Sequence, residues 1–309
     1  MSDQHKVILY GAGVAPDRVS AHVFRDLLDV FLEGAERALR FRMEGRSTAK
    51  GAPPHWLRSA SDFSLVRRAD LEASAALIEA RPLIETMSER FKQGDMFVDL
   101  DPRQSPLELF EAALEDALLG NEDSDRFDLG LLRTIERFDN LFSNEIGGVE
   151  IINGRTIRID RAAIARVRQI SAKAYSAQRV RIAGRLETIR YSDCRFTLVL
   201  LDGTTLQGTA LELGHDALQN HFGRTVVVTG KAVFRASGKP LRIEAESIEI
   251  ASERDAVIWS SAPKPLLAPH PGRQLREEQR GKMGFGALLG QWPGDESDEE
   301  LKAAMEAPS

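Results

Sequence analysis

Five short segments rich in Val, Ile, Leu, Thr and Phe, between Gln178 and Ala251, constrain the fold of this chain more than any other feature. Asp202-Gly203 separates LVLL from TTLQG, and this pair is a strong signal for a two-residue β-hairpin because both residues tolerate positive φ. Ser237-Gly238 predicts a second, longer hairpin between KAVFR and PLRIE. Apolar and polar residues alternate along the segments, as they do in strands that bury one face. The region therefore predicts five strands joined by tight turns.

A helix-like segment interrupts this pattern between the third and fourth predicted strands. It runs from Ala217 to Phe222 and ends at Gly223. The order of three strands, one helix and two strands resembles the oligonucleotide/oligosaccharide-binding (OB) barrel, and the length fits. The resemblance covers about a quarter of the chain and rests on topology rather than on a catalytic motif. We therefore expect residues 178–252 to form an OB-like five-stranded β-barrel.

Length and composition place the chain in an ordinary class. Its 309 residues, 42% hydrophobic and 28% charged, are typical of a soluble globular protein with two domains and linkers. No apolar run is long enough for a membrane span, and the N-terminus lacks the pattern of a signal peptide. The single cysteine, Cys194, cannot form an internal disulfide, so we expect a cytoplasmic protein. A net charge of -6 argues against a protein that coats nucleic acid but permits a local basic patch.

Residues 1–145 carry the pattern of a small α+β domain. The first strand, KVILY, ends in Gly11-Ala12-Gly13, but the third glycine of a dinucleotide-binding turn is missing, so we interpret these glycines as a plain turn. Helical periodicity and alternation predict three helices and two further strands. These are a helix from Arg18 to Met43, paired strands at Asp62–Arg68 and Ala75–Ala80, and helices at Pro106–Leu119 and Asp128–Phe142.

Three segments lie outside the two predicted domains. Residues 146–177 combine a hairpin around Asn153-Gly154 with a basic helix capped by Asp160, and they either connect the domains or extend the barrel. Residues 253–282 contain four closely spaced prolines and predict a stiff, extended linker. Residues 283–309 form an acidic tail. The predicted fold class is therefore α+β, with a small N-terminal α+β domain, an OB-like barrel and a flexible C-terminal tail.

Motifs for catalysis are hard to find in this sequence. The six histidines show no metal-ligand spacing, and no nucleophile elbow or phosphate-binding glycine loop is present. The carboxylate clusters at 99–101 and 122–125 are explained more simply as solvated loops than as sites for a divalent ion. We therefore expect a non-enzymatic protein with no cofactor and no metal.

A basic segment from Arg155 to Arg190 carries ten positive residues against Asp160 and Glu187 alone. A surface with this much like charge usually faces a polyanion or an acidic partner, although these side chains could equally pair with the acidic N-terminal domain. OB barrels that bind single strands stack bases on outward aromatic residues, and the outer positions of the second and third strands carry none. Nucleic-acid binding is therefore the second hypothesis. Its candidate residues are Arg166, Arg168, Lys173, Arg179, Arg181, Arg185 and Arg190.

The acidic tail carries the more specific signal. Its sequence GALLGQWPGDESDEEL combines an apolar patch, a tryptophan, a Pro-Gly turn and an acidic helix start, with Ser297 and Glu300 at capping-box spacing. Such a segment cannot bury its own apolar face well behind a proline-rich linker, so we expect it to dock on a partner protein or back on the barrel. The candidate partner-binding residues are Phe285, Leu288, Leu289, Trp292, Asp295, Glu296, Asp298, Glu299 and Glu300, with Arg276 and Arg280 upstream.

The segment from Gly290 to Leu301 is similar to the C-terminal ends of many small bacterial proteins encoded beside PIN-domain ribonuclease toxins. In those proteins this segment belongs to the partner that neutralises the toxin. About 280 residues precede the tail here, and they contain no evident ribbon-helix-helix or helix-turn-helix. The resemblance therefore implies binding of a toxin rather than of an operator. The leading hypothesis is an antitoxin-like inhibitor of a nuclease, and the alternative is an OB-fold nucleic-acid-binding protein.

Overall fold

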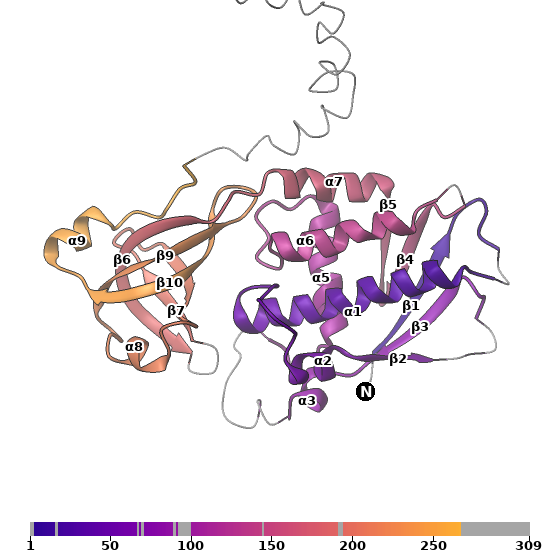
Figure 1. Cartoon of the computed structure of the whole chain (residues 1–309), viewed down its shortest axis with the longest axis horizontal. Coiled ribbons are helices and arrows are strands. Elements are labelled where there is room, and N and C mark those ends of the chain that lie inside the picture. Colours follow the sequence, from indigo (N-terminus) through magenta and orange to yellow (C-terminus); the bar gives the residue numbers. More distant parts are fainter. Residues whose placement is uncertain are drawn as a thin grey trace, which may run out of the picture. The chain divides into compact units, whose positions relative to one another are not determined.

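The first domain is built on a five-stranded sheet with strand order β2-β3-β1-β4-β5, in which every neighbouring pair is antiparallel (Figure 1). The computed structural model describes residues 3–15, 18–66, 68, 71–88, 91, 100–143, 145–190 and 194–266. The strands of this sheet are β1 (Asp3–Tyr10), β2 (Phe63–Val66), β3 (Ala75–Ala80), β4 (Gly148–Asn153) and β5 (Arg155–Asp160). The expected pairing of the strands near residues 62–68 and 75–80 is confirmed.

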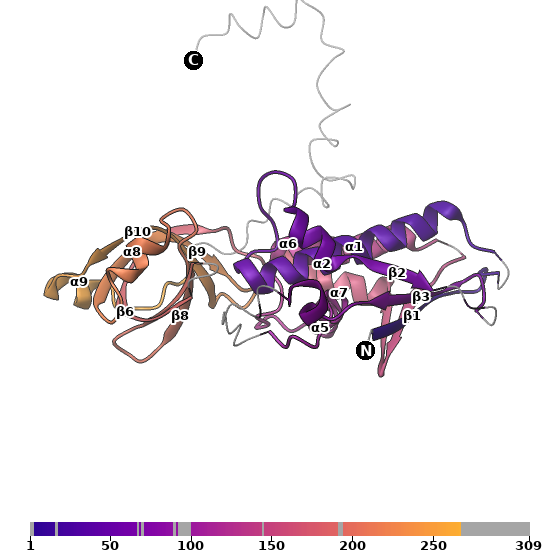
Figure 2. The same cartoon turned by 90° about the horizontal axis from the view of Figure 1, so that it is seen from below.

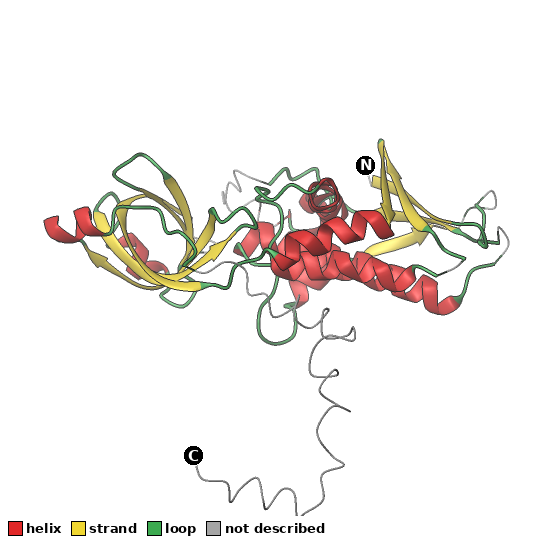
Figure 3. Ribbon diagram, turned by 90° about the horizontal axis from the view of Figure 1, so that it is seen from above, coloured by secondary structure: helices red, strands yellow, loops and turns green. Residues whose placement is uncertain are grey.

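The helices of the first domain share one hydrophobic core with this sheet. They lie beside one another in the views of Figures 1 and 3. Their bounds are α1 (Ala21–Glu44), α2 (His55–Ser61), α3 (Leu83–Thr86), α5 (Pro106–Leu119), α6 (Leu129–Glu136), the 3₁₀ helix η1 (Arg137–Leu141) and α7 (Arg161–Ala172).

Local sequence explains where α5 begins and how closely α1 approaches it. Ser105 and Glu108 form a capping box at the start of α5, with Pro106 in the first turn. At Gly34 of α1 a Cβ atom would lie 2.5 Å from the ring of Phe110, which is fully buried. A glycine in mid-helix costs up to about 1 kcal/mol relative to alanine, and the close packing of α1 on α5 accounts for it here.

The segment 146–177 differs from the connector that the sequence suggested. The hairpin turns at Asn153-Gly154 as expected, with Gly154 at φ 64°, but β4 pairs with β1, so the hairpin completes the first sheet. Helix α7 begins at Arg161, and Asp160 caps it by accepting from the Ala163 N–H. The apolar face of α7 joins the core of the first domain. The first domain therefore extends through α7, because β4 of this hairpin is the second neighbour of β1 in the sheet, beside β3.

The second domain is a closed barrel with strand order β10-β8-β7-β6-β9, closed by pairing of β9 with β10. Only β8 and β10 run parallel among its pairs. This is the order of an OB barrel, with a helix between the third and fourth strands, and it confirms the expected fold class. The elements are β6 (Gln178–Arg190), β7 (Arg195–Val199), β8 (Thr205–Thr209), α8 (His215–Gln219), β9 (Thr225–Phe234) and β10 (Pro240–Ile250).

The chain after β10 departs from the extended linker predicted for residues 253–282. Helix α9 (Glu253–Ile258) begins at Ser252, whose hydroxyl accepts from the Asp255 N–H, and it lies against the barrel (Figure 2). The Ala183 N–H donates to the Trp259 carbonyl oxygen at 2.8 Å, and Ala262 packs on the barrel core. The number of prolines could not predict this, because a helix cap, one backbone hydrogen bond and one apolar contact hold the segment. The rest of that linker, residues 267–282, and the predicted tail, residues 283–309, lie outside the described residues.

Candidate functional site

The basic segment Arg155–Arg190 meets carboxylates of its own chain along its first half. On β5 and α7 these side chains face acidic residues of the first domain. The pairs are Arg155 with Glu115, Arg158 with Glu150 at 2.6 Å, Arg168 with Asp139 at 2.7 Å and Lys173 with Glu122 at 2.5 Å. Arg166 instead donates to the Leu118 carbonyl oxygen at 2.9 Å. Exposed ion pairs contribute little stability, but they do cancel local charge.

The second half of the segment lies on β6 and is partly neutralised as well. Arg179 pairs with Glu246 at 3.2 Å, and Arg185 pairs with Glu187 at 2.9 Å. The Arg181 guanidinium lies 5.4 Å from the ring centre of Trp259, which is cation–π distance. Of the two interpretations of this segment, intramolecular pairing is therefore the one that the observed contacts favour.

The outer surface of β7 and β8 is polar, as the sequence suggested. The Thr188 hydroxyl donates to the Thr197 hydroxyl oxygen at 2.6 Å, and Thr197 donates to the Gln207 side-chain oxygen at 3.5 Å. Phe196 points into the barrel, where it is 1% exposed. The described residues of these two strands therefore present hydroxyls and amides, rather than aromatic rings on which bases could stack.

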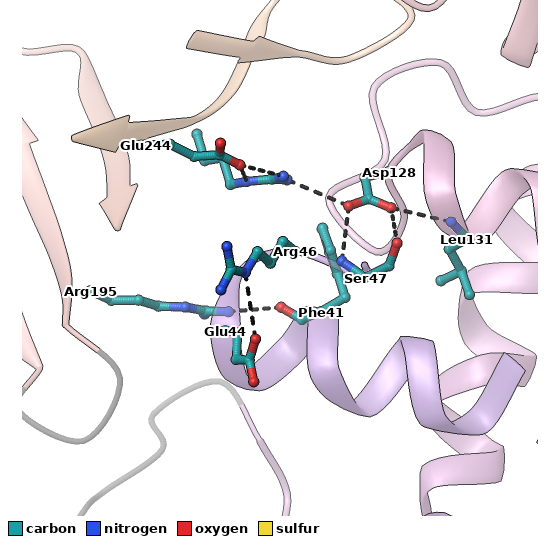
Figure 4. A network of polar contacts seen from close by, with 9 residues as sticks. Phe41, Glu44, Arg46, Ser47, Asp128, Leu131, Arg195 and Glu244 are labelled. Atoms are coloured by element: carbon teal, nitrogen blue, oxygen red, sulfur yellow. Dashed lines mark hydrogen bonds and ion pairs between the residues drawn. The ribbon is translucent and has the colours of Figure 1, made fainter. Parts of the chain in front are cut away.

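A buried polar network joins α1, α6 and the barrel strand β10, and its centre is Asp128 (Figure 4). Asp128 caps α6 by accepting from the Leu131 N–H at 3.2 Å. The same carboxylate accepts from the Ser47 N–H at 3.0 Å and from the Ser47 hydroxyl. Its Oδ2 also lies 3.6 Å from Nη1 of Arg242, whose Nη2 donates to Glu244 at 2.9 Å. One carboxylate thus accepts hydrogen bonds from a helix start and a loop and forms an ion pair with a barrel arginine.

The end of α1 forms the second half of this network. Gly45 ends the helix with φ 75°, and its N–H donates to the Phe41 carbonyl oxygen at 2.9 Å. Nη2 of Arg195, at the start of β7, donates to the same carbonyl oxygen at 2.7 Å. A cation at a helix C-terminus is stabilised by the helix dipole, so this contact stabilises the observed position of β7 against the end of α1. The sequence predicted a helix that begins at Asp128, but no local signal marked Arg195 or Arg242.

The turn between β9 and β10 touches the loop that precedes α6. Nη1 of Arg235 donates to the Asp123 carbonyl oxygen, and Lys239 Nζ donates to the Asp123 carboxylate at 2.5 Å. The hydrogen bond from Lys239, and after it that from Ser237, holds the pKa of the Asp123 carboxyl below its ordinary value. The sequence predicted that this acidic loop is solvated, whereas in the structure Asp123 contacts the turn between β9 and β10.

A cavity of about 270 Å³ lies beside this network. Among the described residues, its charged lining consists of Arg42, Arg195, Arg235, Arg242 and one carboxylate, Asp125.

A larger cleft of about 950 Å³ runs along α1 and is lined by both signs of charge. Glu33 there pairs with Arg37 at 2.5 Å and also with Arg137.

The one cysteine lies in the barrel near a histidine. Cys194 is 7% exposed, its φ is 52°, and its Sγ lies 3.5 Å from Nδ1 of His215. Within the described ranges, no group of three His, Cys, Asp or Glu side chains is placed to hold a metal ion.

The candidate residues of the tail, with Arg276 and Arg280, lie outside the described residues. In the part of the chain that the structure does describe, no helix is long and apolar enough to cross a membrane. Comparison with protein-family models, curated proteins and solved structures finds no match for this chain.

Proposed function

We propose that this chain is a non-enzymatic, antitoxin-like protein that binds and neutralises a partner nuclease of the PIN type through residues 283–309. The observation that carries the proposal is the sequence from Gly290 to Leu301, in which a tryptophan and a Pro-Gly turn precede a run of carboxylates. The two folded domains act as a scaffold. Their last described residue, Leu266, is attached to β6 because its N–H donates to the Gln178 side chain at 3.1 Å.

The composition of the tail assigns different roles to its two parts. A nuclease that binds RNA must present positive charge around its active site, and the carboxylates of 295–300 complement that charge as a mimic of phosphates. Trp292 fills an adjacent apolar pocket. Charge complementarity mainly speeds association, whereas a buried aromatic anchor mainly slows dissociation. Arg276 and Arg280 could instead reach the metal-binding carboxylates of the nuclease directly.

The test is co-expression with a PIN-type nuclease, if one is encoded beside this chain, comparing the full chain with one that ends at Arg273. The shorter chain keeps α9 and the contacts of Ala262 and Leu266, so its domains stay intact. We expect the full chain to restore growth and to co-purify with the nuclease, and the shorter chain to do neither. Rescue by the shorter chain would show that the tail is not the inhibitory element.

Point variants of the tail separate the two roles. Trp292→Ala should raise the dissociation rate, at a cost of about 2 kcal/mol or more in binding free energy if the residue is a hot spot. Neutralising the carboxylates of 295–300 should slow association, and more strongly at low salt. Surface plasmon resonance measures both rates. Equal effects of the two changes on the dissociation rate would contradict the assigned roles.

Nucleic-acid binding through the basic segment Arg155–Arg190 is the second candidate, and the OB strand order of the barrel supports it. It ranks second because several of these cations already meet carboxylates of the chain, which leaves less charge to displace counterions from a phosphate backbone. The reversal Arg179→Glu, Arg181→Glu, Arg185→Glu should abolish retention of DNA or RNA on a filter if the hypothesis holds. The unmodified chain retaining neither nucleic acid at low salt would rule it out.

A further inference from the structure

The cleft of about 950 Å³ along α1 belongs to the first domain alone, because its lining comes from α1, the loop that follows it, α2 and the start of η1. Among the described residues, this lining carries four arginines and four carboxylates, so the cleft has no excess of either charge. What it binds must therefore depend on where the individual charges lie. Glu36 and Arg40, which both line the cleft, are about one helical turn apart on α1.

Arg40 is a buried arginine whose donors lack an acceptor. The residue is 5% exposed, and its guanidinium makes no hydrogen bond with any described residue. The Glu44 carboxylate lies 3.9 Å from Nε, which is beyond hydrogen-bond distance, and it also lies 3.5 Å from Nε of Arg46. One carboxylate thus serves two arginines. Buried donors are nearly always satisfied in folded proteins, so Arg40 indicates an acceptor in the cleft that it lines.

Glu36 is the complementary group on the same helix. It is half-buried, and it makes no hydrogen bond or ion pair with a described residue. Glu and Arg residues four apart on a helix commonly pair, as Glu33 and Arg37 do at 2.5 Å. The adjacent Arg37 is therefore engaged by Glu33, and it also donates to the Gly130 carbonyl oxygen at 2.7 Å. Glu36 and Arg40 line one cleft as opposite charges that do not pair with each other.

We propose that this cleft binds a short peptide in its zwitterionic form, with the peptide ammonium at Glu36 and the peptide carboxylate at Arg40. A guanidinium binds a carboxylate in bidentate geometry, and charge-assisted hydrogen bonds hold an ammonium group on a carboxylate. The two residues lie about 6 Å apart along the helix axis, and an extended dipeptide spans about 7 Å. The volume is at the upper end of the range for small-ligand pockets, which leaves room for the side chains of the peptide.

The experiment is isothermal titration calorimetry of the full chain with alanyl-alanine, with its N-acetyl form and with its C-terminal amide. Acetylation removes the ammonium group, and amidation removes the carboxylate. We expect saturable binding of the free dipeptide. Each modified form should bind about tenfold more weakly or worse, because it loses one charge-assisted interaction. This site lies outside the tail, so the result is independent of the nuclease proposal.

Variants assign each end of the peptide to one residue. Glu36→Gln should abolish the preference for a free ammonium group and keep the preference for a free carboxylate, and Arg40→Gln should do the reverse. The matched control is Asp29→Asn, which changes an exposed carboxylate in the same cleft about 10 Å from Glu36 along α1, and it should leave both preferences unchanged. Glu36 has no hydrogen bond to lose, so Glu36→Gln stays informative even if Arg40→Gln destabilises the domain.

Three results would overturn the proposal. The first is absence of heat with the free dipeptide at millimolar concentration and low salt, which would mean that water alone satisfies Arg40. The second is equal affinity for the free and the modified dipeptides, since neither charge would then be recognised. The third is loss of the ammonium preference in Asp29→Asn to the same extent as in Glu36→Gln, which would mean non-specific attraction to the acidic side chains of the cleft.

Discussion

Replacing Asp128 tests how much the buried network around this carboxylate stabilises the protein. In Asp128→Ala, α6 loses its cap, which costs about 1 kcal/mol in the free energy of unfolding. The backbone N–H and hydroxyl of Ser47, which is 1% exposed, lose their acceptor, at a further cost of about 1–3 kcal/mol. Arg242 keeps Glu244 as a partner, so we add little for that ion pair. The expected total is about 2–4 kcal/mol.

A second variant at the same position separates the cap from the contacts of the other carboxylate oxygen, Oδ2. Asparagine caps helices as well as aspartate does, so Asp128→Asn can keep the bond from the Leu131 N–H and that from the Ser47 hydroxyl. Its amide then replaces the oxygen that faces the Ser47 N–H and Arg242. We expect Asp128→Asn to cost about 1–2 kcal/mol, all of it from the two contacts of Oδ2.

The assay is urea unfolding followed by two probes, with Ser105→Ala as the matched control. Ser105 is a fully buried cap of α5, and its hydrogen bonds lie within the first domain. Its loss should cost about 1 kcal/mol, which is the price of a cap alone. If Asp128→Ala costs no more than Ser105→Ala and Asp128→Asn costs nothing, the contacts of Asp128 with Ser47 and Arg242 add no stability beyond the cap, and this reasoning is refuted.

Three further predictions follow from the described contacts. Glu111→Leu should destabilise the first domain by about 1–3 kcal/mol in chemical denaturation, because it removes the hydrogen-bond partner of the fully buried His5, whose Nδ1 lies 2.6 Å from Glu111. Adding His5→Leu should recover part of the lost stability. The lowered pKa of the Asp123 carboxyl contributes stability that is present above its pKa in the unfolded chain and is lost as pH falls through its pKa in the folded protein. Lys239→Met should therefore raise the midpoint of the Asp123 carboxyl in an NMR titration and reduce the loss of stability in acid. An unchanged midpoint would contradict this. A chain that ends at Ser261 should melt a few degrees below one that keeps every described residue, because it loses backbone and core contacts of the barrel, and equal midpoints would show that those contacts are negligible.

The barrel could be predicted from the sequence because its signals are local. Asp202-Gly203 and Ser237-Gly238 set the turns, alternation set the buried face of each strand, and a helix-like segment with a terminal glycine marked the place of α8. The starts of α5 and α7 were equally readable, because Ser105 and Asp160 are caps whose partners lie three residues away. Each of these features depends on neighbours in the chain.

The partners of the hairpin and of the basic segment were decided only by the tertiary structure. Alternation shows that β4 has a buried face, but not that its neighbour is β1, which lies about 140 residues earlier in the chain. A count of charges likewise shows ten cations between Arg155 and Arg190, yet the carboxylates that neutralise Arg168 and Lys173 come from other elements.

The cavity beside the network of Asp128 shows most clearly which features depend on consecutive residues and which depend on the tertiary structure. The start of the helix at Asp128 could be predicted from the sequence, and the N–H that Asp128 caps is three residues away. The guanidinium groups of Arg195, Arg235 and Arg242 come together with the end of α1 only when the barrel closes and packs beside it. Short-range steric and hydrogen-bonding preferences are written in consecutive residues. Which charges meet across a fold depends on long-range packing, and there the residue types alone do not specify the partner.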